Sequence, residues 1–168
     1  NTTICKNGNT TLSVVATGGS GIFSYQWQTA TALGGPYTDI GGANSDTYIT
    51  SILPATTYFR VVVTNSGSGC NTLTSNVATV FVGDISVQPV APAPICSGGS
   101  ATVSVTASAN GGTATFTYQW ESSADGLTAW TAIGSATSNS YTTPALSNTT
   151  YYRCIVTSTT PNCTLTSD

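Results

Sequence analysis

Short stretches in which apolar and polar residues alternate recur along this chain of 168 residues. In the stretch TTYFRVVVT, alternation puts Phe59, Val61 and Val63 on one face and Arg60 on the other. Because Arg60 must reach water, the face with Phe59 is predicted to be the core face. Thr, Val, Ile and Tyr dominate such stretches, and Gly, Asn, Ser and Pro clusters separate them. No useful length of helical spacing occurs, so the pattern predicts an all-β chain.

Most of this pattern occurs twice along the chain, as an internal repeat. TTYFRVVVT returns as TTYYRCIVT at residues 149–157. Further matches follow in the same order: ICKNGNTTLSVVATGGSGIFSYQW (4–27) with ICSGGSATVSVTASANGGTATFTYQW (95–120), SDTYIT (45–50) with SNSYTT (138–143), and GCNTLTSN (69–76) with NCTLTSD (162–168). The period is about 92 residues, the length of one small β-sandwich domain. We therefore predict two tandem antiparallel β-sandwiches.

The two predicted domains, residues 1–83 and 84–168, differ at their ends. Residues 84–96, DISVQPVAPAPIC, are expected to give repeat two a turn at Asp84, a first strand and a Pro-bearing entry, and repeat one has no such segment. Repeat one closes with SNVATVFV, residues 75–82, which is predicted to be its final strand. We expect repeat one to lack its first strand and repeat two its last. The chain is therefore expected to be either a window on a longer periodic array or a subunit whose open edges are completed by strand addition from neighbouring repeats.

Aromatic residues are predicted at the centre of both cores: Trp27, Trp120, Phe59 and Tyr152. Both tryptophans end a Tyr-Gln-Trp sequence within a predicted strand. Cys154 replaces Val61 in the second copy, and we expect it to be a buried free thiol that packs as a small apolar side chain.

Charge is scarce, with 5% Asp, Glu, Lys and Arg and a net charge of -3, against about 25% charged residues in an average soluble domain. No basic patch occurs, so nucleic acid is not an expected partner. The 39% of hydrophobic residues alternate with polar ones, so a core can form despite the low charge. No apolar run approaches the roughly 20 residues of a membrane helix, so we expect no membrane span.

Five cysteines in a chain without histidine favour disulfides over zinc and indicate an extracellular setting. The simplest pairing is within each repeat, Cys5 with Cys70 and Cys96 with Cys163. The predicted strand order puts these partners at opposite poles of a sandwich, which a disulfide cannot span. In the alternative, Cys5 faces Cys163 across the domain junction, and Cys70 and Cys96 pair with neighbouring repeats or chains. Sequence does not fix the connectivity.

The stretch LSNTTYYRC (146–154), which follows a strand with a central tryptophan, resembles the immunoglobulin and fibronectin type III layout. This resemblance implies that Tyr152 is the corner tyrosine, a role that Phe59 cannot fill in repeat one. Through ICSGGS, TVSVTAS, FTYQW and TTYYR, the repeat is also similar to Ig-like modules found in tandem in giant cell-surface proteins of Bacteroidota. That resemblance implies type IX secretion and a role in adhesion, gliding or surface display.

Little in the sequence favours catalysis. Without histidine, no Ser-His or Cys-His system can exist. Glu121 and Asp125 could supply two carboxylates, but ESSADG is typical of a turn. Asp84 alone falls short of the six or so oxygens that calcium needs. We predict no enzyme activity, no cofactor and no metal site.

Trp130 and Tyr37 occupy matching positions on a short strand predicted near the sheet edge. They either cover the flank of the core or form a glycan platform, which in repeat two would be flanked by Thr128 and Thr131. The function predicted first is a structural stalk or spacer of a secreted bacterial surface adhesin or extracellular filament, with neighbouring repeats as partners. The alternatives are a module that binds surface glycans and an accessory domain of a secreted hydrolase.

Overall fold

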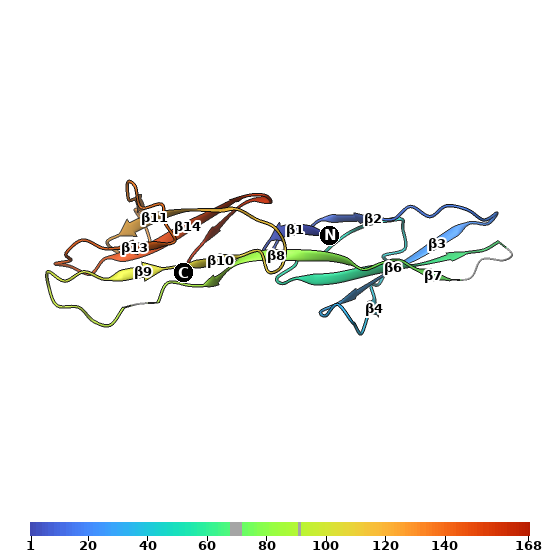
Figure 1. Ribbon diagram of the computed structural model, residues 1–168, viewed down its shortest axis with the longest axis horizontal. Helices are drawn as coiled ribbons and strands as arrows, with labels where there is room; N and C mark the ends of the chain where they lie inside the picture. The colour runs from blue at the N-terminus through green and yellow to red at the C-terminus, as the bar shows by residue number, and fades with distance from the viewer. Residues whose placement is uncertain (68–71, 91) are drawn as a thin grey trace. The chain divides into compact units, whose positions relative to one another are not determined.

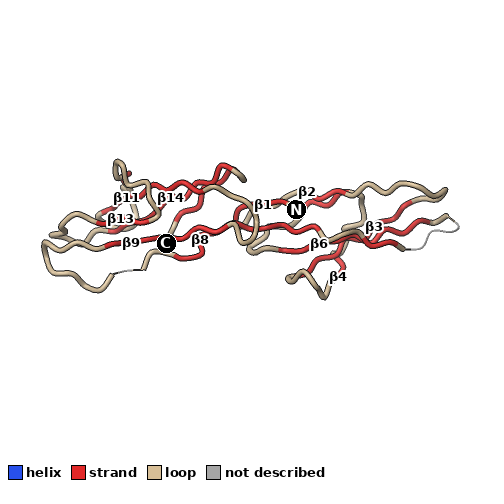
Figure 2. The backbone as a smooth tube through the Cα atoms, viewed as in Figure 1, coloured by secondary structure: helices blue, strands red, loops and turns tan. Residues whose placement is uncertain are grey.

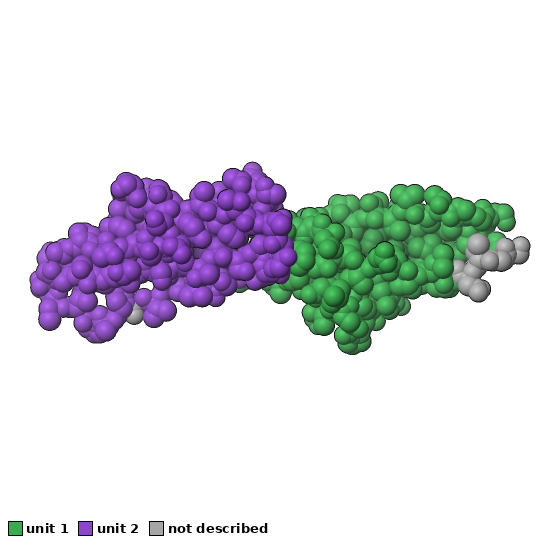
Figure 3. All heavy atoms as spheres, in the orientation of Figure 1, with its two compact units in different colours: residues 1–82 green, residues 83–168 purple. Residues whose placement is uncertain are grey.

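The computed structural model describes residues 1–67, 72–90 and 92–168. In these ranges every regular element is a β-strand, and no helix occurs (Figure 2). The prediction of an all-β chain is therefore confirmed. The chain divides into two compact units, residues 1–82 (unit 1) and residues 83–168 (unit 2), which are coloured separately in Figure 3.

Unit 1 is an antiparallel β-sandwich (Figure 1). One sheet has the strand order β1-β8-β6-β3-β4, with β7 also paired to β6, and the other consists of β2 and β5. The initial residues of repeat one form β1 beside β8, at the place in the repeat that residues 93–96 hold in repeat two. The strands are β1 (Thr2–Cys5), β2 (Thr11–Ser13), β3 (Phe23–Ala30), β4 (Thr38–Asp39), β5 (Thr47–Ile49), β6 (Thr57–Asn65), β7 (Leu73–Thr74) and the first part of β8 (Ala78–Val87).

Unit 2 repeats this plan. Its larger sheet has the order β12-β11-β14-β15, and β9 pairs with β13 in the facing sheet. The second part of β8 pairs with β10, so that Ile85 lies across from Ala107. The strands are β9 (Thr102–Ser104), β10 (Thr106–Ser108), β11 (Phe116–Ser123), β12 (Thr131–Ala132), β13 (Ser140–Thr142), β14 (Tyr151–Thr159) and β15 (Asn162–Thr166).

The boundary between the units falls inside β8. This strand pairs with β6 through Ala78–Val80 and with β10 through Asp84–Val87. The predicted turn at Asp84 is therefore wrong: Asp84 continues the strand, and its Oδ1 accepts a hydrogen bond from the N–H of Ile85 at 2.8 Å. The prolines of the predicted entry segment follow the end of β8 and belong to unit 2.

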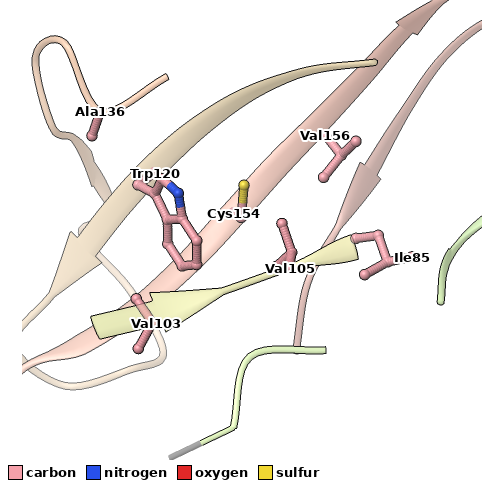
Figure 4. Close-up of a cluster of buried hydrophobic side chains, with 7 residues drawn as sticks. All are labelled: Ile85, Val103, Val105, Trp120, Ala136, Cys154 and Val156. Carbon is pink, nitrogen blue, oxygen red and sulfur yellow. The ribbon is translucent and has the colours of Figure 1, made fainter. Parts of the chain in front are cut away.

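Each unit buries one tryptophan at its centre. In unit 1, Trp27 lies across from Val61, and Phe59 is also buried. In unit 2, Trp120 lies across from Cys154, and Tyr152 is half-buried at the edge of the core. Figure 4 shows Cys154 beside Trp120, with Val103 and Val105 on the facing strand.

The Tyr-Gln-Trp sequence has a structural reason that sequence analysis missed. The side chain of Gln119 donates from Nε2 to the carbonyl oxygens of Trp120 and Ile133, at 2.9 and 2.8 Å. Gln26 makes the same two contacts in unit 1, both at 2.9 Å. The glutamine amide thus ties the tryptophan strand to the segment beside it in both units. The feature of the sequence that could have indicated these contacts is the identical Gln before each Trp.

Candidate functional site

The strongest candidate for a binding site is an arginine stacked on an aromatic ring, which recurs at equivalent positions of both units. In unit 1, the guanidinium carbon of Arg60 lies 4.2 Å from the centre of the Tyr37 ring. In unit 2, that of Arg153 lies 4.3 Å from the centre of the Trp130 ring. At this distance a guanidinium is attracted by the negative face of the ring. Both arginines of the chain are used in this way.

Strand register brings the polar partners of each arginine into one row. Arg60 lies across from Gln28, and Gln28 lies across from Asp39 on β4. Arg60 Nε donates to Gln28 Oε1 at 2.6 Å, and Gln28 Nε2 donates to Asp39 Oδ1 at 2.7 Å. The Tyr37 hydroxyl donates to the Leu33 carbonyl oxygen at 2.8 Å. All of these groups are therefore held within the unit.

In unit 2 a carboxylate takes the place of Gln28. Arg153 lies across from Glu121, and its Nε and Nη2 both lie 2.7 Å from Glu121 Oε2. The ion pair fixes the guanidinium plane over the half-buried Trp130 ring. A sugar stacks on an open ring face, and here one face of each predicted glycan contact, Trp130 and Tyr37, is covered by an arginine.

The second carboxylate of the predicted turn, Asp125, closes its own loop. It accepts hydrogen bonds from the N–H groups of Leu127 and Thr128 at 2.9 and 2.8 Å, from the Thr128 hydroxyl at 2.6 Å, and from Ser123 Oγ at 2.8 Å. These donors hold the pKa of Asp125 well below its usual range, and the Thr128 hydroxyl contributes most. Glu121 and Asp125 thus each have a structural partner, and neither forms a pair of opposed acid and base carboxylates.

The cysteines depart from the simplest predicted pairing. Cys5 and Cys163 are disulfide-bonded, Cys96 is a free exposed thiol, and Cys70 lies outside the described residues. The predicted bond between Cys96 and Cys163 is wrong. Cys163 lies across from Ser158 near the end of β14, and the loop after Cys96 borders the start of that strand. The two cysteines therefore lie near opposite ends of β14, whose nine extended residues span about 25 Å. The Cα atoms of a disulfide lie within about 7 Å of each other, so this pair is too far apart to be bonded.

Cys154 is free and fully buried. Burial raises the pKa of its thiol to about 11, so the reactive thiolate is scarce at neutral pH. Among the described residues, no group of three or more His, Cys, Asp or Glu side chains could hold a metal ion. Nor do these residues include a helix long and apolar enough to cross a membrane.

The family described as a domain of unknown function, DUF8696, matches residues 1–84 and 88–168. The chain belongs to the DUF8696 family. The two matched stretches of DUF8696 cover nearly all of both sandwich units. No curated protein matches the sequence.

Several solved structures resemble this DUF8696 chain. The three N-terminal domains of the bacteriophage RB49 Highly Immunogenic Outer Capsid protein (Hoc) match with a TM-score of 0.49 and 11% identity, over 98% of this chain and 62% of that one. The fibronectin(III)-like modules of Clostridium thermocellum CbhA match with a TM-score of 0.38 and 14% identity, over 98% and 86% of the two chains. The amphioxus IgVJ-C2 molecule matches with a TM-score of 0.33 and 10% identity, over 92% and 91%. These likenesses are distant, and the predicted antiparallel β-sandwich fold of each unit is confirmed by its own strand pairing.

Proposed function

We propose that this chain is a structural spacer in a secreted bacterial surface adhesin or extracellular filament. The observation that carries the proposal is that the side chains that could bind a ligand, an arginine and an aromatic ring in each unit, contact each other instead. Arg60 and Arg153 each cover one face of an aromatic ring, Tyr37 and Trp130, that would otherwise be open to a ligand. Equivalent residues make these contacts in both units, as expected if each unit maintains its own shape and the chain gains length by repetition.

The setting of this spacer is extracellular in our proposal. Disulfide-bonded Cys5 and Cys163 support an oxidising compartment. The resemblance of the repeat to tandem modules of giant Bacteroidota surface proteins supports a surface array and type IX secretion. In such an array the partners are neighbouring repeats.

The proposed spacer is not an enzyme. Its Glu121 carboxylate is neutralised by Arg153, and Asp125 accepts four hydrogen bonds from its own loop. Asp125 is not poised to move a proton, because its hydrogen bonds stabilise the ionised form.

A glycan-array and cell-surface binding screen of the 168-residue chain tests the proposal, with Trp130→Ala and Tyr37→Ala beside the unchanged chain. A spacer should show no saturable binding in any of the three forms. Binding of a defined sugar that disappears in either variant, with an unchanged circular dichroism spectrum, would make the chain a glycan-binding module and overturn the spacer role.

A further inference from the structure

The outer edge of β11, in the middle of the unit 2 sequence, is open along Phe116–Tyr118. β14 pairs with one side of β11 along its whole length, but on the other side β12 pairs only with Glu121 and Ser122. An open cavity of about 630 Å³ follows the unpaired part of this edge. We call this cavity the edge groove, and its lining residues are Phe116, Thr117, Tyr118, Thr137, Ser138 and Asn139.

The backbone groups of two β11 residues point away from β14 along this edge. The Trp120 N–H donates to the Ala136 carbonyl oxygen at 3.0 Å, and the Ile133 N–H donates to the Trp120 carbonyl oxygen at 2.9 Å. Backbone groups alternate along a strand, so those of Tyr118 and Phe116 point to the same side as those of Trp120. In the described part of the chain, no backbone group pairs with them on that side. Such unpaired backbone groups are a template for another strand.

The edge groove lacks the features by which sheets usually prevent pairing with other chains. Natural sheets protect their edges with charged side chains, prolines or β-bulges. The lining residues are uncharged and include no proline, and β11 pairs with β14 in continuous register from Phe116 to Ser123. The groove is therefore open to an uncharged strand.

Unit 1 has the same kind of edge on β3, at Phe23–Tyr25, because β4 pairs only with Gln28 and Thr29. The two edges differ in charge. The repeat aligns SDTYIT with SNSYTT, so Asp46 takes the place of Asn139. Two unit 1 edges would bring like charges into one groove, whereas two unit 2 edges would not. Pairing of like edges is therefore favoured in unit 2.

We propose that the edge groove binds the same edge of a second copy of this chain, in an antiparallel pair with two-fold symmetry about Thr117. Phe116 of each copy then lies across from Tyr118 of the other, and the two residues exchange both of their backbone hydrogen bonds. Aromatic residues directly across from each other attract on one face of the joined sheet, and the two Thr117 side chains meet on the other face. The edge is complementary to itself, which is why the partner is a second copy.

The proposed contact is small, so each pair of chains is held weakly. Beyond Tyr118 the edge is occupied, since the Trp120 backbone is bonded to Ala136. Before β11 the chain turns, and the Gly112 N–H donates to the Ala109 carbonyl oxygen at 3.0 Å. Three residues of each copy therefore pair, and the dissociation constant is on the order of 1 mM. The inference concerns contact between chains and does not rest on the spacer role.

Sedimentation equilibrium and amide NMR shifts of the 168-residue chain, recorded up to about 2 mM, test the proposal. All samples carry Cys96→Ser, because the exposed free thiol would otherwise link chains on oxidation. We expect a monomer–dimer equilibrium, with the concentration-dependent shifts clustered at Phe116–Tyr118. Spectra that do not change with concentration would overturn the proposal.

Charge at position 117 gives a sharper test. Thr117 is exposed, so Thr117→Lys and Thr117→Asp should each retain the circular dichroism spectrum of the fold. Each should raise the dissociation constant at least about tenfold, because like charges meet at the two-fold axis. An equimolar mixture of the two variants should restore the dimer, since lysine then faces aspartate.

Ser24→Lys is the matched control on β3. Ser24 is also exposed, and its hydroxyl donates to the Thr64 carbonyl oxygen at 3.4 Å as that of Thr117 donates to the Thr157 carbonyl oxygen at 3.3 Å. This variant should dimerise like the unchanged chain. A dimer that persists in both Thr117 variants, or that is lost in Ser24→Lys, would place the contact on another surface and overturn the proposal. So would a mixture that stays monomeric.

Discussion

Cys154 lies directly across from Trp120 on neighbouring strands, the position that Val61 holds across from Trp27. Both side chains are fully buried, and the tryptophan indole N–H donates to a backbone carbonyl oxygen at 2.9 Å in each unit. The cysteine therefore fills the volume of a valine beside an otherwise unchanged tryptophan site. Its place in unit 2 is explained by packing.

Cys154→Val should leave the free energy of unfolding within about 1 kcal/mol of the unchanged chain, because the two side chains are similar in volume and both apolar. Cys154→Ser should lower it by about 1–3 kcal/mol, since a hydroxyl is buried in an apolar site. Guanidinium unfolding followed by circular dichroism measures both. A serine variant as stable as the valine variant would show that the site is less apolar than its neighbours indicate.

The same thiol gives the stability a pH dependence. Its pKa is raised by burial from an ordinary value of 9.0 to about 11. The unfolded chain therefore loses this proton first, so the stabilising contribution is complete below pH 9 and is lost as pH rises toward 11. Unfolding measured from pH 8 to pH 11 should show a steeper loss in the unchanged chain than in Cys154→Val. Identical slopes would contradict the raised pKa.

The two free thiols should differ in reactivity. Iodoacetamide at pH 8 should label exposed Cys96 in the native chain and leave buried Cys154 unlabelled until denaturant is added. Peptide mapping by mass spectrometry distinguishes the two sites. Labelling of Cys154 at the rate of Cys96 in native conditions would mean that the core of unit 2 opens readily.

Arg153→Ala should expose the Trp130 ring, because the guanidinium covers one face of it. Acrylamide quenching of tryptophan fluorescence should increase, since Trp27 and Trp120 are buried in the cores and respond little. Stability should fall by about 1 kcal/mol. The matched control is Arg60→Ala, which uncovers a tyrosine and should leave tryptophan quenching unchanged. Equal quenching in both variants would place the Arg153 side chain away from the ring.

The Asp125 carboxylate should remain ionised well below its usual pKa of 3.8. Because the pKa of Asp125 is lower in the folded chain than in the unfolded chain, the ionised carboxylate stabilises the fold above pH 3.8. This stabilisation is lost as the pH falls through the lower pKa of the folded chain. Carbon-13 NMR titration of the aspartate carboxyls should show this late protonation. Thr128→Val removes the largest contribution and should move the titration up toward 3.8, whereas an unchanged titration would mean that the backbone N–H donors alone suffice.

Sequence by itself determined the all-β fold, the repeat and the identity of the central core residues, because these follow from local alternation and from side-chain size. Trp27, Trp120 and Phe59 are buried on the side that alternation assigns to them. The pairing of the cysteines and the environment of Trp130 could not be obtained in this way. They depend on which residues of distant strands come to lie opposite each other, and strand register is a tertiary property.

Tertiary structure alone decided two features that bear on function. It placed Arg60 and Arg153 over the aromatic rings, although each arginine is distant in sequence from its ring. It carried β8 through the predicted turn at Asp84, because that strand finds partners on both sides of the boundary.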